Sequence, residues 1–559
     1  MFSLECRLNE TLSLAAMPSI AARRRPRASS AAVTSSSDTL QRRNAAMTFD
    51  QISLGENGIG STGSGKGDGR FGRKRGTLAR FAAALLLATC VSAPLTAAWA
   101  QQEPFATPSP REEESPSEPS IASSLPPWLG TTFGLRPWLA SMGITYQVNQ
   151  ISEGWRNSQG GEKLGNTYVG RTELAIETDL EKLIGWKGGS THVNGYWIQG
   201  HGLSGYYIGN ILAVSNIEAL PTVRLFEAWF EQKLFNDTTS VRIGQLAADT
   251  EFITSEYAGL FINGTFGWPG ITAADLPSGG PAYPLATPAV RLKYSPTPQT
   301  SFLVAVFNGD PAGPGDPDQD PQLRDKYGVN FRVQDPPFVI GEGQFKYTAV
   351  TGLPGTLKFG GWYHFDSFDD QRFGADGRLL ADEENSNGIP VRHRNNSGIY
   401  GVIDQQLFRI AGMADDKGVG MFARASASPS NRNLIDLYFD AGLTFTGFVP
   451  YRPDDAFGIA FGYARISRVA QAFDRDVAYF ATLPPEEEGE LPGLPPPIRS
   501  YEAVLEVTYQ AQIVPGWTIQ PDFQYIINPG GHVADPADPD GLRPLRNALV
   551  FGVRTTVNY

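Results

Sequence analysis

The chain has 559 residues, of which 61 are Gly and 42 are Pro, with 11% aromatic and 19% charged residues. With no long apolar stripes at helical spacing, this composition argues against a helical bundle or solenoid and favours strands and turns. Both cysteines, Cys6 and Cys90, lie in the first 100 residues, and the rest carries 33 basic and 52 acidic residues, a net charge of −19. That part therefore has no thiolate nucleophile and no Cys metal ligand, and its charge weighs against nucleic acid as a partner.

Residues 1–100 predict a presequence that ends in a cleaved secretory signal peptide at about 70–100. A basic stretch is followed by an apolar one over 81–93 and by a small-x-small cleavage site at 98–100. The apolar stretch is too short for a spanning helix, and Pro94 follows it directly. We therefore expect export, with Met1 or Met47 as the translation start.

Two short segments separate the signal peptide from the main body of the chain. Residues 101–125 are rich in Pro, Ser and Glu, and such a segment cannot bury enough apolar surface to order itself. We expect a disordered leader there, and a short helical periplasmic segment over 126–142.

From residue 143 to 559, segments of about ten residues alternate apolar and polar side chains, with Gly, Pro and Asp between them. In 224–234, Phe226 and Phe230 fall on one face, while Glu227 and Glu231 fall on the other. A soluble sandwich alternates in the same way, but an exported Cys-free chain with so many segments favours a transmembrane barrel. The candidate strands are 143–150, 166–180, 189–199, 223–234, 239–246, 287–295, 299–308, 325–334, 341–349, 355–368, 396–409, 417–427, 433–447, 455–468, 500–512, 516–527 and 546–558.

Bacterial single-chain barrels have an even number of strands, so one of these seventeen candidates is spurious. Long connections, among them 369–395 and 469–499, fall on the outer side and short turns on the inner side only if 327–334 is a hairpin arm within an outer loop. The predicted fold is therefore all-β: an antiparallel transmembrane β-barrel of 16 strands, wide enough for an aqueous channel. The 40-residue loop 247–286 holds many aromatic residues, and we expect it to fold into the barrel and narrow it rather than form an external lid.

Several stretches, in this order along the chain, resemble those of a known family. They are WLGTTFGLRPWLASMGI (128–144), DLEKLIGWKGG (179–189), GLSGYYIGN (202–210), RLFEAWFEQKL (224–234) with RIGQL (242–246), FINGTFGWP (261–269), GIYGVIDQQL (398–407) and PDFQYIINPGG (521–531). On these stretches the chain resembles the carbohydrate-selective, OprB-like porins of Gram-negative outer membranes.

The resemblance implies passive diffusion of glucose-type sugars into the periplasm, with Arg, Glu and aromatic side chains at a constriction. It also implies contact with outer-membrane lipid and lipopolysaccharide, and recognition of the terminal Tyr559 by the barrel-insertion machinery. A homo-oligomer is one alternative that the sequence leaves open.

A sugar is neutral, dense in hydroxyl groups and apolar on one ring face, so a selective pore needs hydrogen-bonding groups and flat rings. A wide lumen is polar in any case, so each inward side chain can also be merely solvated. Strand parity gives these candidates for the pore lining: Arg171, Glu173, Glu227, Trp229, Glu231, Arg242, Arg291, Lys293 and Trp362. We expect Arg171, Glu227, Trp229 and Arg242 to matter most, because their strands border the largest early loop.

The sequence offers little for an enzyme or a metal site. His364 and Asp366 share a strand face, but no Ser with a nucleophile context accompanies them. The acidic run 316–320 begins like a calcium loop, yet Pro321 stands at the required Gly position. We expect no catalysis, no metal and no cofactor, and the alternatives are a porin for another solute, a barrel enzyme or an adhesin.

Overall fold

The computed structural model describes residues 119–316, 319–349, 351–484 and 493–559. The predicted signal peptide and most of the predicted leader lie outside these residues. The strands are β1 (Ile144–Gln159), β2 (Gly165–Asp179), β3 (Gly189–Gly200), β4 (Thr222–Leu234), β5 (Thr239–Leu246), β6 (Thr287–Thr297), β7 (Thr300–Phe307), β8 (Phe338–Thr348), β9 (Pro354–Gly374), β10 (Pro390–Arg409), β11 (Gly418–Ala427), β12 (Ile435–Thr446), β13 (Ala456–Ile466), β14 (Tyr501–Val514), β15 (Trp517–Ile527) and β16 (Ala548–Asn558).

Short helices and turns lie before the barrel and in its loops. Among the described residues no helix is long and apolar enough to cross a membrane. The helical elements are η1 (Ile121–Ser124), α2 (Pro127–Gly130), α3 (Leu135–Ser141), α4 (Leu180–Ile184), η2 (Ser204–Ile208), η3 (Tyr257–Leu260), α5 (Gly264–Gly267), α6 (Gly270–Asp275), η4 (Pro277–Gly279), α7 (Pro321–Arg324), α8 (Arg468–Ala481) and α9 (Pro529–His532).

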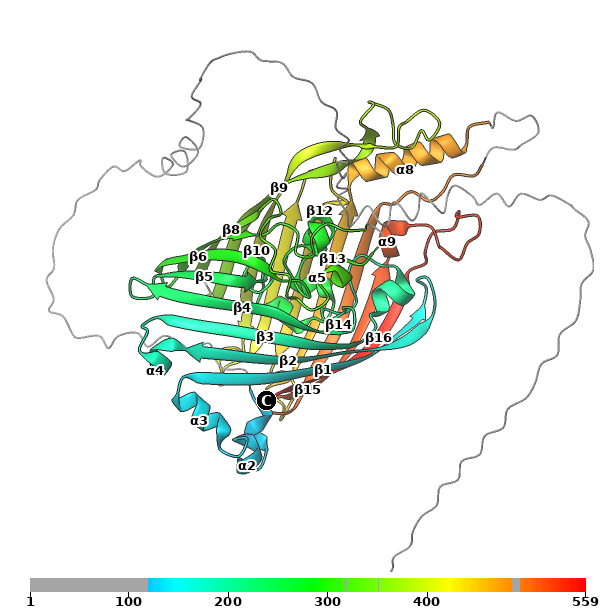
Figure 1. The fold of residues 1–559 in the computed structure, drawn as a ribbon. Helices are drawn as coiled ribbons and strands as arrows, with labels where there is room; N and C mark the ends of the chain where they lie inside the picture. Colours follow the sequence, from blue (N-terminus) through cyan, green and yellow to red (C-terminus); the bar gives the residue numbers. More distant parts are fainter. Residues whose placement is uncertain (1–118, 317–318, 350, 485–492) are drawn as a thin grey trace, which may run out of the picture. The chain divides into compact units, whose positions relative to one another are not determined.

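Each strand pairs antiparallel with its neighbours in sequence, and β1 closes the circle by pairing with β16 (Figure 1). The predicted 16-stranded antiparallel barrel is confirmed. Residues 327–334 contribute no strand, as the even count requires, but the hairpin arm expected there is absent as well. Closure leaves no unpaired strand edge, which is the condition for a sheet in lipid.

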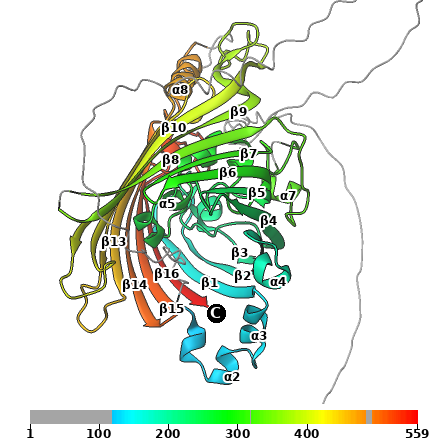
Figure 2. The ribbon, with the colours of Figure 1, turned by 90° about the vertical axis from the view of Figure 1, so that its left-hand side faces the viewer.

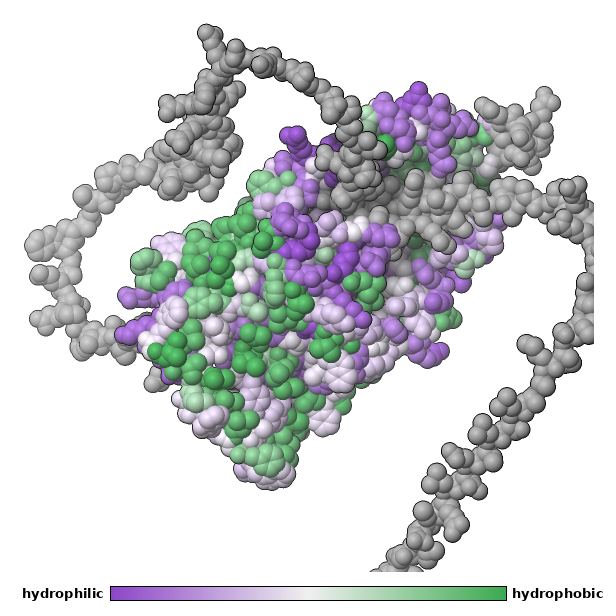
Figure 3. Space-filling model, viewed as in Figure 1, coloured by the Kyte–Doolittle hydropathy of each residue, from purple (hydrophilic) through white to green (hydrophobic). Residues whose placement is uncertain are grey.

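The two faces of the wall differ in exposure, and the outward face is apolar. On β7, Phe302, Val304 and Val306 are about half exposed on the outside, whereas Leu303 and Ala305 are buried on the inside. The same alternation around the barrel produces the apolar surface that covers the strands in Figure 3, with hydrophilic residues on the loops beyond it. This surface is the lipid-facing belt of an outer-membrane barrel.

Two of the expected outer loops carry regular structure that the alternation did not predict. β9 and β10 extend beyond the expected boundaries and stay paired as far as Pro390 and Gly374. The segment 469–499 contains the helix α8, which Ser467 caps by accepting a hydrogen bond from the Ala470 N–H. We call this end of the barrel the loop end, and the opposite end, where the short turns lie, the turn end.

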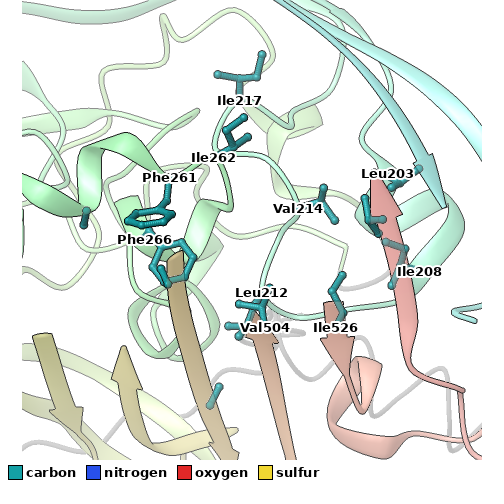
Figure 4. Close-up of a cluster of buried hydrophobic side chains, with 14 of the residues drawn as sticks. Leu203, Ile208, Leu212, Val214, Ile217, Phe261, Ile262, Phe266, Val504 and Ile526 are labelled. Atoms are coloured by element: carbon teal, nitrogen blue, oxygen red, sulfur yellow. The ribbon is translucent and has the colours of Figure 1, made fainter. Parts of the chain in front are cut away.

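Two further loops turn back into the barrel. Figure 2 shows α5, from the loop 247–286, inside the ring of strands. The loop 201–221 enters beside it, and apolar side chains from both loops pack on inward residues of β14 and β15 (Figure 4). The close-up labels Leu203, Ile208, Leu212, Val214, Ile217, Phe261, Ile262 and Phe266 from the loops, with Val504 and Ile526 from the strands.

Cysteine labelling tests which end faces outward. In a chain whose two native cysteines are replaced by Ser, we expect Ala537→Cys, at the loop end, to react with a membrane-impermeant maleimide on intact cells. Tyr451→Cys, on a turn at the opposite end, should react only after the outer membrane is opened, because long loops of such barrels face outward. Reaction of the Tyr451 variant alone would reverse the orientation.

Candidate functional site

The loop 247–286 is fixed in the lumen by Arg424 on β11. Its guanidinium donates to the carbonyl oxygens of Thr265 and Phe266 at 2.9 and 2.8 Å, and to those of Ile253 and Gly267 at 3.0 Å. It also pairs with Asp440 on β12 at 2.6 Å, and both side chains are 0% exposed. A buried pair with all its hydrogen bonds satisfied holds one geometry, so Arg424 sets the position of this loop.

Carboxylates on β8 and β14 bind the backbone of the inward loops from other sides of the barrel. Glu506 on β14 accepts hydrogen bonds from the backbone N–H groups of Ile262 and Asn263 at 2.6 and 2.9 Å. Glu502, on the same strand, accepts from Leu212 N at 2.6 Å, and Glu342 on β8 accepts from Ile253 N at 2.8 Å. Backbone N–H groups of the loops, which would otherwise lack partners, are thereby satisfied by inward side chains of the wall.

Two carboxyl groups inside these loops have raised pKa values. Burial raises the pKa of Glu218 to about 7, although it accepts hydrogen bonds from Leu203 N and Ser204 N. Burial also raises the pKa of Asp249 to about 6, against the hydrogen bond it accepts from Tyr283 N. A raised pKa means that the folded state holds the proton more tightly than the unfolded chain. The stabilisation that results is complete below the ordinary carboxyl pKa and is lost as the pH rises through about 6 to 7.

The wall from β2 to β6 carries a different arrangement, which we call the charge ring: Glu231, Arg242, Glu251 and Arg291. Arg242 lies 2.9 Å from Glu231 and 3.7 Å from Glu251, and Arg291 lies 3.0 and 2.8 Å from the same two carboxylates. Glu231, Arg242 and Arg291 stand next to one another on β4, β5 and β6, whereas Glu251 comes from the inward loop. The charges of the ring balance, and all four groups are hydrogen-bonding donors or acceptors.

The ring of Trp229, on β4, lies between side chains of the two flanking strands, β3 and β5. The Arg242 guanidinium lies over its ring, 3.7 Å from the centroid, and the His192 imidazole stacks on it at 5.0 Å with 14° between the planes. Because His192 on β3 and Arg242 on β5 flank β4 from opposite sides, both ring faces are occupied. In this structure the Trp229 ring therefore contacts the imidazole and the guanidinium on its two faces.

Three other predicted lining residues are buried in the structure. Glu227 accepts a hydrogen bond from Ala247 N at 2.9 Å and so fixes the start of the inward loop. Trp362 is 5% exposed and lies in an apolar cluster with Phe338 that the loop covers. Arg291, a member of the charge ring, is 1% exposed. All three side chains are buried where the loop 247–286 packs on the wall.

The remaining predicted residues keep some exposure toward the lumen. Arg171 lies 3.4 Å from Glu173, and its guanidinium also lies over the rings of Tyr196 and Tyr283. Lys293 on β6 is half-buried, with no ion-pair partner among the residues that the structure describes. Tyr283 was missed by sequence reasoning because it belongs to a loop, as does Glu251, and strand parity says nothing about loop side chains.

The two halves of the lumen wall differ in what they leave open. On β10 to β15, Asp404, Glu506, Thr508 and Gln520 are buried under the loops. On β2 to β5, the inward side chains of Arg171, Glu173 and Arg242 remain 16 to 19% exposed. The loops therefore cover these groups of β10 to β15 more completely than those of β2 to β5, although the loop 247–286 also covers Glu227 and Arg291. We call the partly exposed side, β2 to β5, the accessible side of the lumen.

The ring of His364 forms hydrogen bonds with backbone groups. The His364 ring contacts the Gly309 carbonyl at 2.9 Å and accepts from the backbone N–H of Asp366, so it makes no acid–base pair with the Asp366 carboxylate. Within the described ranges, no three His, Cys, Asp or Glu side chains gather as metal ligands would.

Comparisons with known proteins agree with this architecture. The model of the OprB family of carbohydrate-selective porins matches residues 163–559. Porin B of Pseudomonas aeruginosa is 24% identical over 442 residues, which cover 76% of this chain and 90% of that protein. The high-pH structure of Pseudomonas putida OprB superposes with a TM-score of 0.65 at 21% identity, over 77% of this chain and 97% of that one.

Removing the loop anchor tests whether the loop 247–286 narrows the lumen. We expect Arg424→Met to raise the single-channel conductance in planar bilayers, because the change strands the buried Asp440 carboxylate, at a cost of about 3–5 kcal/mol, and frees four carbonyl groups of the loop. Pairing it with Asp440→Asn should recover part of the loss in stability. An unchanged conductance in a folded Arg424→Met barrel would contradict this role of the loop.

The charge ring makes a prediction for ion selectivity. Arg242→Gln leaves a negative ring, so the reversal potential in a KCl gradient should shift toward cation selectivity. The matched control is Arg156→Gln, which removes an exposed arginine from the outward face of β1 and should leave the reversal potential unchanged. Equal shifts in both variants would mean that bulk charge, not the ring, sets selectivity.

Proposed function

Since the chain belongs to the OprB family of carbohydrate-selective porins, an outer-membrane channel rather than an enzyme, we propose that it passes glucose-type monosaccharides into the periplasm by passive diffusion. Sugar is the solute class of this family, and the choice of glucose-type monosaccharides is the finer part of the proposal. Export through a cleaved signal peptide, contact with lipopolysaccharide and recognition of Tyr559 during insertion belong to the same proposal.

The observation that carries the proposal is the charge ring on the accessible side of the lumen. Sugars are neutral, so a ring with balanced charges attracts them without collecting counter-ions as a ring of one sign would. Its guanidinium and carboxylate groups present donors and acceptors a few ångströms apart, which suits adjacent sugar hydroxyls. Because Arg242 is held by Trp229, Glu231 and Glu251, little order remains to be imposed when a sugar binds.

A porin for another solute is the second candidate. An anion channel would be favoured by cations without carboxylate partners at the narrow zone, and only Lys293 among the predicted lining residues fits that description. The paired arginines of the ring support the sugar proposal instead.

Blocking of ion current by glucose tests this proposal. Arg242→Ala and Glu251→Ala each remove a charge-assisted hydrogen-bonding group worth about 1.5–3 kcal/mol, so the glucose concentration for half-block should rise about tenfold or more. Arg242→Lys, which keeps the charge but loses the planar fork, should fall in between. The outward Arg156→Ala serves as the control and should block as the parent does.

Two results would count against it. Current in the parent that is unaffected by glucose at high concentration would remove the sugar assignment. Normal glucose block in both ring variants would move the selective zone away from the charge ring.

A further inference from the structure

The segment before β1 lies on the outward side of the barrel wall. Outward side chains of β1 have even numbers and those of β16 have odd numbers, since Glu153 and Arg554 meet inside while Arg156 and Phe551 are exposed outside. Tyr146 and Tyr559 therefore both point outward at the turn end. The backbone of Tyr559 pairs with Val148, which extends the ladder of the two closing strands by one residue.

The segment 127–141 contacts both of these tyrosines. The Arg136 guanidinium lies 5.4 Å from the centroid of the Tyr146 ring and 5.0 Å from that of Tyr559. The Thr132 hydroxyl contacts the Tyr559 hydroxyl at 2.6 Å, and Tyr559 also donates to the carbonyl of Leu129. Because the tyrosines face outward, the segment that contacts them lies against the lipid side of the wall.

Three successive residues with positive φ bend the backbone of the segment where it contacts the tyrosines. Thr132, Phe133 and Gly134 have φ values of 50°, 56° and 86° in succession, a conformation that a β-branched residue such as Thr rarely adopts. The bend directs the Thr132 hydroxyl to the tyrosines, and Phe133 next to it is exposed.

The other side of the segment is apolar, and among the described residues its large side chains stay exposed. Phe133 is 77% exposed and Trp138 58%, and Trp128 and Leu135 are also exposed. A neighbouring patch continues this surface: Asp179, at the start of α4, donates its N–H to the Gly143 carbonyl at 2.7 Å, and Ile184 and Trp186 follow, both exposed. We call this surface the apolar rim: Trp128, Phe133, Leu135, Trp138, Ile184 and Trp186.

The place of the rim decides what can cover it. The Trp186 ring lies 5.3 Å from the ring of Phe230, an outward residue of β4, so the rim is continuous with the lipid-facing belt. Figures 1 and 2 show α2, α3 and α4 at the turn end, where β1 begins. Trp and other aromatic side chains at the edge of such a belt are positioned at the headgroup level of a bilayer.

We propose that residues 127–141 and α4 are an interfacial anchor, whose apolar rim inserts into the leaflet at the turn end of the barrel. The occupant is the headgroup and upper acyl region of phospholipid. Arg136 and Thr132 hold the anchor on the paired strands β1 and β16 through their contacts with Tyr146 and Tyr559. Such short helices lie in the interface without crossing the bilayer.

Quenching of a fluorescent label tests the anchor in the whole protein. The chain, with Cys6 and Cys90 replaced by Ser, is reconstituted in phosphatidylethanolamine–phosphatidylglycerol vesicles and labelled with an environment-sensitive probe at Phe133→Cys or Trp138→Cys. We expect lipids with a spin label near the headgroup to quench the probe at least about twofold more than aqueous iodide does. A probe at Ala414→Cys, exposed on another turn at the same end, should show the reverse order.

Two outcomes would overturn the anchor. Iodide quenching equal to that at Ala414 would mean that the rim stays in water, and protection from both quenchers would mean that a second copy of the chain covers it. In Arg136→Ala, lipid quenching at Phe133 should fall as the segment loosens from Tyr559. Unchanged quenching in a folded Arg136→Ala variant would show that the Arg136 contacts do not hold the anchor.

Discussion

The pairing of β1 with β16 is the constraint on which the rest of the structure depends. Without it the sheet would expose a row of backbone N–H and C=O groups to lipid, which a membrane does not tolerate. Closure also encloses the space into which two loops fold, and it brings Tyr559 beside the segment that precedes β1. A single ladder between the two ends of the barrel thus makes both the lumen and its surroundings possible.

Inside the barrel, the polar residues of the wall divide into two kinds. The polar residues of β8 and β10 to β15 hold the loops. Arg424 and Glu506, for example, bind loop backbone and are buried with it. On β4 to β6, Glu231, Arg242 and Arg291 bind one another and the loop residue Glu251, and Arg242 stays partly exposed. Glu227 on β4 is an exception, because it holds the loop backbone at Ala247. The same residue types therefore serve packing on one side and solute contact on the other, and the path of the inward loops decides which.

Much of the barrel could be predicted from alternation, because a membrane imposes an apolar outward face on each strand. β4 and β7 were located within two residues for this reason. The rule fails where the membrane ends: β9 continues to Gly374 and stays paired, but its outward side chains there need not be apolar. The helix α8 was missed because its segment had been assigned to a loop by the strand count, although Ser467 before an amphipathic run is a helix-start signal.

The candidate site was predicted less well, and the reason is physical. Parity tells which way a strand residue points, so Arg242 and Glu231 could be placed inside the barrel. It does not tell what covers an inward residue, because the covering loop comes from elsewhere in the chain. Glu227 and Trp362 were therefore assigned to the lining although the loop buries them, and Glu251 was not considered although it completes the ring.

Passage of solute along the accessible wall beside the charge ring is the central step of the proposed transport. A structure determined with a heavy-atom-labelled glucose analogue bound would test it most directly. We expect the sugar within hydrogen-bonding distance of Arg242 and Glu251. A sugar bound instead between the inward loops and β10 to β15, with the ring unoccupied, would contradict it.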